Sequence, residues 1–230
     1  MPEKEIQSIY QIIDVAGQAL WLLPEKAIFW KERAMLILTD LHLGKAGHFR
    51  KAGIPIPTSV HEADLLNLQS LIDTYAPEKI LMLGDLFHSE INEEWSQFRN
   101  FLAQHHNLTF VLVKGNHDIL PGDAYREPNL EVHEEEWICA PFHFTHHPPE
   151  KYPYQDLYNM SGHVHPGYRI RGKAGQHIKL PCFFFSPNGA VLPAFGKFTG
   201  CVHVPKKKND QVYAIVPGPG QSAKVIQIKH

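Results

Sequence analysis

The chain has 230 residues, of which 43% are hydrophobic and 20% are charged. These values exclude a disordered chain, a collagen-like repeat and a small disulfide-stapled domain. No apolar run approaches the roughly 20 residues that a membrane helix needs, the N-terminus lacks the features of a secretory signal, and the three cysteines are not closely paired. We therefore expect one folded domain in the reducing cytoplasm, without a membrane span.

Two features of the composition are unusual. Sixteen histidines are roughly three times the average content, and many stand beside Asp, Asn or Gly, as metal-binding histidines do. The net charge of −2 combines two unlike parts: residues 1–160 hold 12 basic and 23 acidic residues, and residues 161–230 hold 10 basic residues and one acidic residue. A surface for an anionic partner is therefore expected late in the chain.

Apolar runs bounded by turn residues predict strands in the first part of the chain. These strands are Ile12–Val15, Ala27–Trp30 and Met35–Thr39. The last is a continuous apolar run, which is typical of a strand buried on both faces. The glycine- and proline-rich segment Leu41–Pro57 follows as a loop, and the capping-box spacing of Ser59 and Glu62 then predicts the start of a helix.

Two more strands and a second helix complete a βαβαβ pattern. The strands are Lys79–Leu83 and Leu108–Val113, and the helix between them runs from Asn92 to Gln104. This alternation predicts an α/β fold with a parallel sheet. Shorter strands follow, which we assign to a second sheet packed on the first: Phe142–Thr145, Tyr168–Arg171, Ile178–Phe185, Val212–Val216 and Lys224–Ile228.

Polar blocks follow the ends of these strands, at the sheet edge where open α/β folds bind ligands. The blocks, in chain order, are Thr39-Asp40-Leu41-His42, Gly84-Asp85, Gly115-Asn116-His117-Asp118, His146-His147 and Gly162-His163-Val164-His165-Pro166. Residues two apart in a strand or tight turn point the same way. Asp40 with His42, and His163 with His165, can therefore each converge on one point.

The donors in these blocks are carboxylate, imidazole and amide oxygen, without thiolate. Such a set suits Mn, Fe or Zn. Each block taken alone belongs to an ordinary loop about as often as to a metal site. Five blocks in this order, four of them at strand ends, would rarely arise by chance. We interpret them as one metal site.

The order of the blocks resembles the calcineurin-like metallophosphoesterase superfamily, over about residues 35–166. The resemblance implies a two-sheet α/β sandwich flanked by helices, as a single domain of residues 1–230. The metal-site motifs would lie in 39–166 and a basic C-terminal part in 167–230. It also implies a site for two divalent ions, with Mn expected and Fe or Zn as alternatives.

The resemblance further implies which side chains hold the two ions. One ion would take Asp40, His42, Asp85 and His165, and the other Asp85, Asn116, His146 and His163. Asp85 would thus bridge the pair. His146 is preferred to His147 because the ligand of the family comes first after the strand.

His117 matches the non-ligand histidine of the family. We expect it to protonate the leaving oxygen as a general acid, with Asp118 or Asp40 as its orienting partner. Many members carry a second aspartate three residues after the bridging one, where this chain has His88. That difference removes no ligand, although it can alter a substrate contact or the surroundings of the ligands.

The motif from Asp40 to Lys45, the stretch through Pro57 and the block at 84–88 look like the SbcD-related branch of the superfamily. More narrowly, they resemble the bacterial DNA-ligase-associated phosphoesterases, regarded as DNA-damage endonucleases. The resemblance implies a nuclease that acts on DNA in repair, with a DNA ligase or helicase as partner. The alternatives are a phosphodiesterase for cyclic nucleotides or other small phosphate esters, and a non-catalytic scaffold, although a scaffold would not need the intact ligand set.

Basic residues directly after the last histidine block predict the substrate surface. Arg169, Arg171 and Lys173 should lie near the metals and contact phosphates on either side of the cleaved bond. A long phosphodiester chain requires several such contacts, whereas a small cyclic ester does not. We therefore favour DNA over a small ester.

Overall fold

The structure of the protein is a computed structural model. It describes residues 9–43, 59–87, 93–171, 175–197, 199–218 and 222–229. His88, Asn92, Lys173, most of the predicted loop 41–57 and the side chains of Ser59 and Glu62 lie outside this description.

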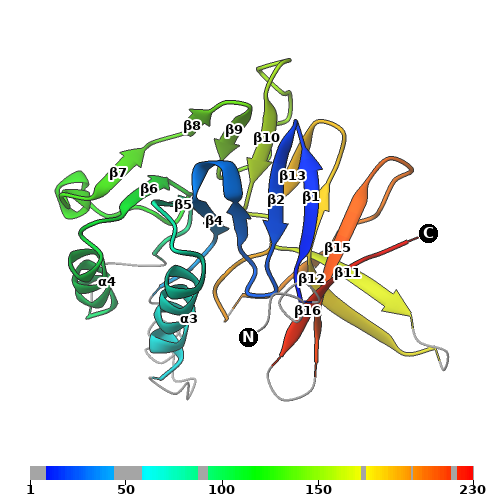
Figure 1. The fold of residues 1–230 in the computed structure, drawn as a ribbon, viewed down its shortest axis with the longest axis horizontal. Helices are drawn as coiled ribbons and strands as arrows, with labels where there is room; N and C mark the ends of the chain where they lie inside the picture. Colours follow the sequence, from blue (N-terminus) through cyan, green and yellow to red (C-terminus); the bar gives the residue numbers. More distant parts are fainter. Residues whose placement is uncertain are drawn as a thin grey trace.

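The first sheet has seven strands in the described part of the chain, in sequence order from β1 to β7. They are β1 (Gln11–Val15), β2 (Gln18–Leu22), β3 (Ile28–Trp30), β4 (Met35–Thr39), β5 (Lys79–Leu83), β6 (Thr109–Val113) and β7 (Leu130–His133). The strands from β4 to β7 are parallel, and the strands from β1 to β4 are antiparallel. The helices α3 (Ser59–Tyr75) and α4 (Glu93–Gln104) connect β4 to β5 and β5 to β6, and both lie on one side of this sheet (Figure 1).

The second sheet has nine described strands, with β14, β11, β12, β13, β10, β9 and β8 as neighbours in that order; β15 also pairs with β12, and β16 pairs with β15. Its strands are β8 (Glu136–Cys139), β9 (Phe142–Thr145), β10 (Tyr158–Ser161), β11 (Pro166–Arg171), β12 (His177–Phe185), β13 (Gly189–Val191), β14 (Val202–His203), β15 (Gln211–Pro217) and β16 (Ala223–Gln227). Two short 3-10 helices complete the described elements, η1 (Lys31–Arg33) and η2 (Gly122–Tyr125).

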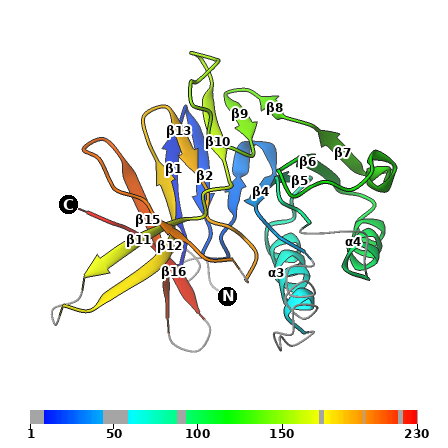
Figure 2. The ribbon, with the colours of Figure 1, turned by 180° about the vertical axis from the view of Figure 1, so that it is seen from behind.

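The cores follow from the side-chain alternation of the strands. All five residues of β4 are buried: Leu36 and Leu38 pack with apolar residues of α3 and α4, whereas Met35 and Ile37 pack with residues of the second sheet. A strand covered on both faces needs a continuous apolar run, which explains the sequence of β4. The layers are therefore helices, first sheet and second sheet, as the views from both sides show (Figures 1 and 2).

The predicted two-sheet α/β sandwich is confirmed, and the strands at Met35–Thr39, Lys79–Leu83 and Phe142–Thr145 have the predicted bounds. The strand β2, which forms a hairpin with β1, was not predicted. The antiparallel pairing from β1 to β4 makes the first sheet mixed rather than purely parallel. No helix in the described ranges is long and apolar enough to span a membrane.

A core residue between the sheets tests this layering. The ring of Phe142 lies 4.8 Å from that of Trp30, centroid to centroid, in a T-shaped contact, and both side chains are fully buried. We expect Phe142→Ala to lower the free energy of unfolding by about 3–5 kcal/mol because it leaves a cavity. Ile12→Ala, at a side chain that is 51% exposed, should change it by about 0.5 kcal/mol or less. Denaturant unfolding measures both, and equal small effects would contradict the packing.

Candidate metal centre

Strand register brings the polar blocks to one level. Thr39 is paired with Leu83 and Leu83 with Val113 across β4, β5 and β6, so the residues that follow these strands emerge together. In the second sheet Thr145 is paired with Ser161, and the blocks that follow β9 and β10 also start side by side. The two groups of blocks meet at the same edge of the sandwich, because His163 N–H donates to Asp40 Oδ2 at 3.0 Å.

The backbone is left-handed at three of these five blocks. Nine non-glycine residues of the described chain have positive φ, and five of them are candidate ligands: Asp40, His42, Asp85, His163 and His165, at +49° to +65°. Such a conformation costs about 1–3 kcal/mol per residue and persists only where the surroundings enforce it. Strain of this kind concentrates at functional sites, which supports a functional reading of these turns.

Backbone hydrogen bonds enforce the turns. Asp40 N–H donates to Gly84 C=O at 3.1 Å, and His42 N–H donates to Asp85 C=O at 2.8 Å. Gly84 itself has φ +76°, and a Cβ on it would lie 2.1 Å from the His146 ring. Glycine is therefore required here both for its conformation and for the close approach of the ring.

One group of donors consists of Asp40, His42 and His165. His42 Nε2 lies 3.4 Å from His165 Nε2, and His165 Nε2 lies 3.3 Å from Asp40 Oδ1. Asp85 Oδ2 approaches this group, at 3.7 Å from His42 Nε2. The structure thus brings together the four side chains that the family resemblance implies for one ion.

The second group of donors surrounds His146. Its Nε2 lies 3.2 Å from His163 Nδ1, 3.3 Å from Asn116 Oδ1 and 3.4 Å from Asp85 Oδ1. The Nδ1 atom of His146 lies 3.0 Å from the Leu83 carbonyl, so it acts as the donor, and Nε2 is the nitrogen that could bind a metal ion. The four side chains predicted for the other ion therefore also lie together, and Asp85 stands between the two groups.

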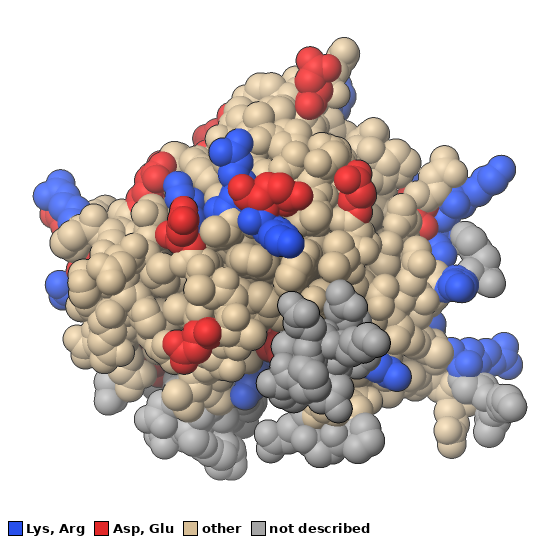
Figure 3. All heavy atoms as spheres, viewed as in Figure 1, with Lys and Arg blue, Asp and Glu red and all other residues tan. Residues whose placement is uncertain are grey.

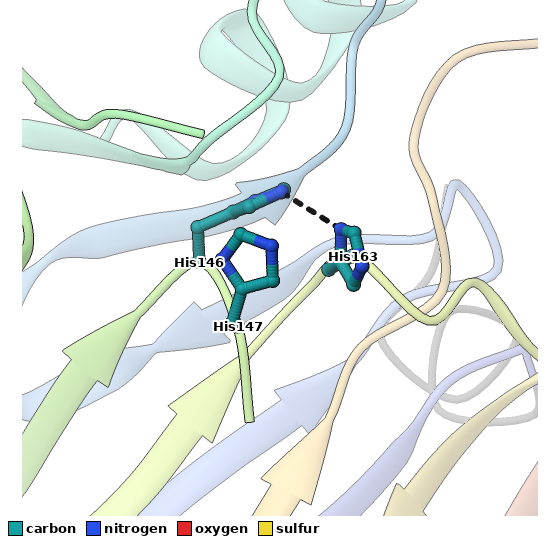
Figure 4. A group of neighbouring side chains, drawn as sticks. All are labelled: His146, His147 and His163. Atoms are coloured by element: carbon teal, nitrogen blue, oxygen red, sulfur yellow. Dashed lines mark hydrogen bonds between the residues drawn. The ribbon is translucent and has the colours of Figure 1, made fainter. Parts of the chain in front are cut away.

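His147 also lies at the site, although His146 was preferred to it as the expected ligand. Its ring is 4.0 Å from the His163 ring, centroid to centroid, and it forms a possible metal-binding group with His146 and His163. Figure 4 shows the three rings turned toward one another beyond the ends of β9 and β10. His146 is buried and His147 is exposed, so His147 stands at the mouth of the site. The adjacent pair His146-His147 placed a histidine at the site, but the sequence could not predict how the His147 ring is oriented.

The spacing of the donors fits metal ions. Two ligand atoms about 2.1 Å from one ion in a tetrahedral arrangement lie about 3.4 Å apart, which matches the spacings of 3.2–3.4 Å around His146. Asp40 Oδ1 is buried and accepts no geometrically sound hydrogen bond from the described residues. A buried carboxylate oxygen of this kind calls for a cation.

The protonation states fit as well. Burial raises the pKa of Asp40, but His165, Thr39 and His146 outweigh this and hold it below its usual value. Burial lowers the pKa of His163, and the neighbouring His146 lowers it further. An ionised carboxylate and a neutral imidazole are the forms that bind metal.

His117 lies beside the donors. Its backbone N–H donates to Asp85 Oδ1 at 3.0 Å, and its ring lies 5.6 Å from the His42 ring. Asp118 is buried, and its two oxygens accept the N–H groups of Phe87, at 3.0 Å, and Gly115, at 2.8 Å. Burial raises the pKa of Asp118. The observed contacts of Asp118 fix the loops after β5 and β6, and its role in orienting the His117 ring stays a prediction.

The predicted substrate residues lie farther along the chain. Arg169 and Arg171 are exposed on β11, and Lys173 falls outside the described residues. At about 3.3 Å per strand residue, Arg169 is about 13 Å and Arg171 about 20 Å from His165. These side chains therefore flank the donor groups rather than line them.

Comparison with known proteins places these motifs in a wider context. The family model of the calcineurin-like phosphoesterases matches residues 34–190. Among solved structures, the nuclease MPE of Pseudomonas putida is similar, with a TM-score of 0.76 and 34% sequence identity. The match covers 89% of this chain and 96% of that one. No curated protein gives a significant match.

A segment after β13 supports the loop of Asp40 from the other side. Phe195 N–H donates to Thr39 C=O at 2.8 Å, and Gly196 N–H donates to Asp40 C=O at 3.2 Å. A Cβ on Gly196 would lie 2.4 Å from the Leu41 carbonyl oxygen. Any other residue at position 196 would therefore displace the loop that carries Asp40.

Buried Asp64 of α3 holds this segment in place. Its two carboxylate oxygens accept the Lys197 N–H at 3.2 and 3.3 Å, and Lys26 Nζ donates to Gly196 C=O at 3.3 Å. Burial raises the pKa of Asp64 to about 6, against the opposing effect of Lys197 and Lys26. Helix α3 thus helps to fix a candidate ligand through this segment.

A small change at this contact should weaken metal binding. We expect Gly196→Ala to reduce the affinity for Mn²⁺ by about 10- to 100-fold, the range found when supports of metal ligands are lost. Gly122→Ala is the matched control, because a Cβ there meets no atom within 4 Å. Titration calorimetry measures both affinities, and equal affinities would show that the segment does not position the Asp40 loop.

Proposed function

The chain belongs to the calcineurin-like phosphoesterase family and is a metal-dependent phosphoesterase, and on that premise we propose that it is a nuclease that hydrolyses phosphodiester bonds of DNA. The observation that carries the proposal is the position of Asp85 between two groups of histidine and carboxylate donors. Similarity to a nuclease over 89% of this chain supports a nucleic-acid substrate.

The ligand assignment of the proposal follows the two donor groups. One ion would be held by Asp40, His42, Asp85 and His165, and the other by Asp85, Asn116, His146 and His163. When bound, two divalent ions lower the pKa of a water and neutralise charge on the phosphate oxygens during in-line displacement. The set lacks thiolate and combines imidazole with oxygen donors, so we propose Mn, with Fe or Zn as the alternatives.

His117 supplies the proton in this proposal. The attacking water releases a proton to solvent, and the resulting hydroxide forms a bond to phosphorus while the bond to the leaving oxygen breaks. His117 donates a proton to the leaving oxygen. Asp85 accepts the backbone N–H of His117, which fixes the histidine beside the bridging carboxylate.

The exposure of the site favours a long substrate. The side chains of Asp40, His42, Asp85 and His146 are buried and form its floor, whereas Asn116, His147 and His163 are exposed at its mouth. A site that opens to solvent admits a bond within a polymer. We further propose that the protein acts in DNA repair, with a DNA ligase or helicase as partner. This part of the proposal rests on the resemblance to the SbcD-related branch.

Loss of the bridging carboxylate tests the assignment. We expect Asp85→Ala to abolish hydrolysis of every phosphate ester and to remove at least one of two bound Mn²⁺ ions, because both ions would share Asp85. Metal content by mass spectrometry and hydrolysis of linear DNA, circular DNA, a cyclic nucleotide and a chromogenic diester measure this. Full activity of the variant would refute the site, and hydrolysis of only the small esters by the unaltered protein would refute DNA as substrate.

The role of His117 makes a separate prediction. His117→Ala should keep both metal ions and slow the chemical step by about 10²–10⁴-fold, the usual contribution of a general acid. Esters with good leaving groups should lose less activity because they need little protonation. Loss of a metal ion from this variant would show that His117 is a ligand, and equal losses for good and poor leaving groups would exclude the acid role.

A further inference from the structure

The outer part of the β11–β12 hairpin is a two-stranded ribbon. Residues 168–171 of β11 pair with 177–180 of β12, whereas β14 pairs only with Pro166 and Gly167, and β15 joins β12 only from Cys182 onward. Figures 1 and 2 show this ribbon extending away from the helices and the first sheet. An isolated pair of strands is marginally stable in water, so it needs support from one of its faces.

One face of the ribbon provides that support. Tyr168 and Ile170 pack against a small apolar cluster that contains Leu180, Cys182 and Val212. Because side chains alternate along a strand, the residues between them point to the opposite face. The ribbon is therefore amphipathic, with its apolar face attached to the second sheet.

The opposite face is basic. Arg169 is paired with Lys179, and Arg171 with His177, and all four residues are exposed. Like charges directly opposite each other destabilise a strand pair, and none of the three Lys and Arg side chains forms an ion pair with a described acidic residue. Folding alone gives no reason for this arrangement, whereas a polyanionic partner would.

The charge distribution of the whole molecule agrees. Residues 161–230 contain a single acidic residue, Asp210, which is buried. Figure 3 shows Lys and Arg side chains along the edge where Figure 1 places β11, β12 and β15, whereas Lys and Arg are mixed with Asp and Glu over the rest of this view. An anionic chain bound at the metal site is thus attracted toward the ribbon.

We propose that the β11–β12 ribbon is an arm that binds the phosphate backbone of duplex DNA beside the metal site. This inference rests on the proposed nuclease function. By strand length, Arg169 lies about 13 Å and Arg171 about 20 Å from His165, so neither side chain reaches the donor groups. On a duplex that rises 3.4 Å per base pair, these distances correspond to about four to six base pairs.

The make-up of the basic face favours a duplex over a single strand. Proteins that bind single strands stack the bases on aromatic side chains, but the face of Arg169 and Arg171 carries no Phe, Tyr or Trp among its described residues, and Tyr168 points to the apolar cluster. A two-stranded ribbon is also narrow enough for the major groove, which is about 12 Å wide. Phosphate contacts without stacking suit duplex DNA.

The salt dependence of binding tests the arm. We expect the double variant Arg169→Gln/Lys179→Gln to make the slope of log affinity against log salt for duplex DNA shallower by about 1.8, or about 0.9 for each lost phosphate contact. At 0.1 M salt, the affinity should fall on the order of ten- to a hundredfold. Fluorescence anisotropy with the metal-loaded protein and a labelled duplex at low temperature measures both quantities.

Two controls separate the arm from a general loss of charge or fold. Lys207→Gln/Lys208→Gln removes the same charge from an exposed loop next to β15 and should keep the slope of the unaltered protein. The exchange variant Arg169→Lys/Lys179→Arg keeps the charge and should bind duplex DNA with the affinity and salt slope of the unaltered protein. An unchanged slope in Arg169→Gln/Lys179→Gln, or an equal change in both Gln variants, would overturn the arm, and an equal loss on single-stranded DNA would overturn the duplex preference.

The same experiment distinguishes the arm from the proposed nuclease function. If the unaltered protein cleaves duplex DNA and the Arg169→Gln/Lys179→Gln variant keeps its salt slope, only the arm is wrong. If the unaltered protein with Mn²⁺ hydrolyses a chromogenic diester but neither form of DNA, the nuclease proposal fails, and the arm fails with it.

Discussion

The structure depends on the left-handed backbone that follows its strands. Asp40, His42, Asp85, His163 and His165 all adopt positive φ, which costs about 1–3 kcal/mol at each position. Hydrogen bonds from the neighbouring loops and the α3-supported segment at Gly196 hold these turns. The packing of the two sheets therefore offsets the cost of bringing these donor groups close together. A bound cation would lower the repulsion between them.

Much of this site could be predicted from the sequence, because parallel register determines where strands end. An apolar run such as Met35–Thr39 fixes a buried strand, and the residues after successive parallel strands must emerge at one edge. The predicted ligands on five separate blocks consequently lie together. Which side chain of each block serves as a ligand was implied by the family resemblance and not by the register.

Features that depend on contacts distant in sequence could not be predicted. The hydrogen bond from Lys197 to Asp64 carries no local signal, and the position of His147 at the mouth depends on ring orientation. The strand β2 was missed because Gln18–Leu22 is short and directly follows β1. The charge split predicted a late basic surface, but only the strand register shows that Arg169 faces Lys179.

The proposed function separates chemistry from substrate capture: the donors at the strand ends would act on the bond, and the ribbon would hold the chain that contains it. Its central claim is that two ions flank Asp85, and anomalous diffraction from crystals grown with Mn²⁺ tests this most directly. We expect two peaks about 3.5–4 Å apart, one on each side of the Asp85 carboxylate. A single peak, or peaks that do not contact Asp85, would contradict the account.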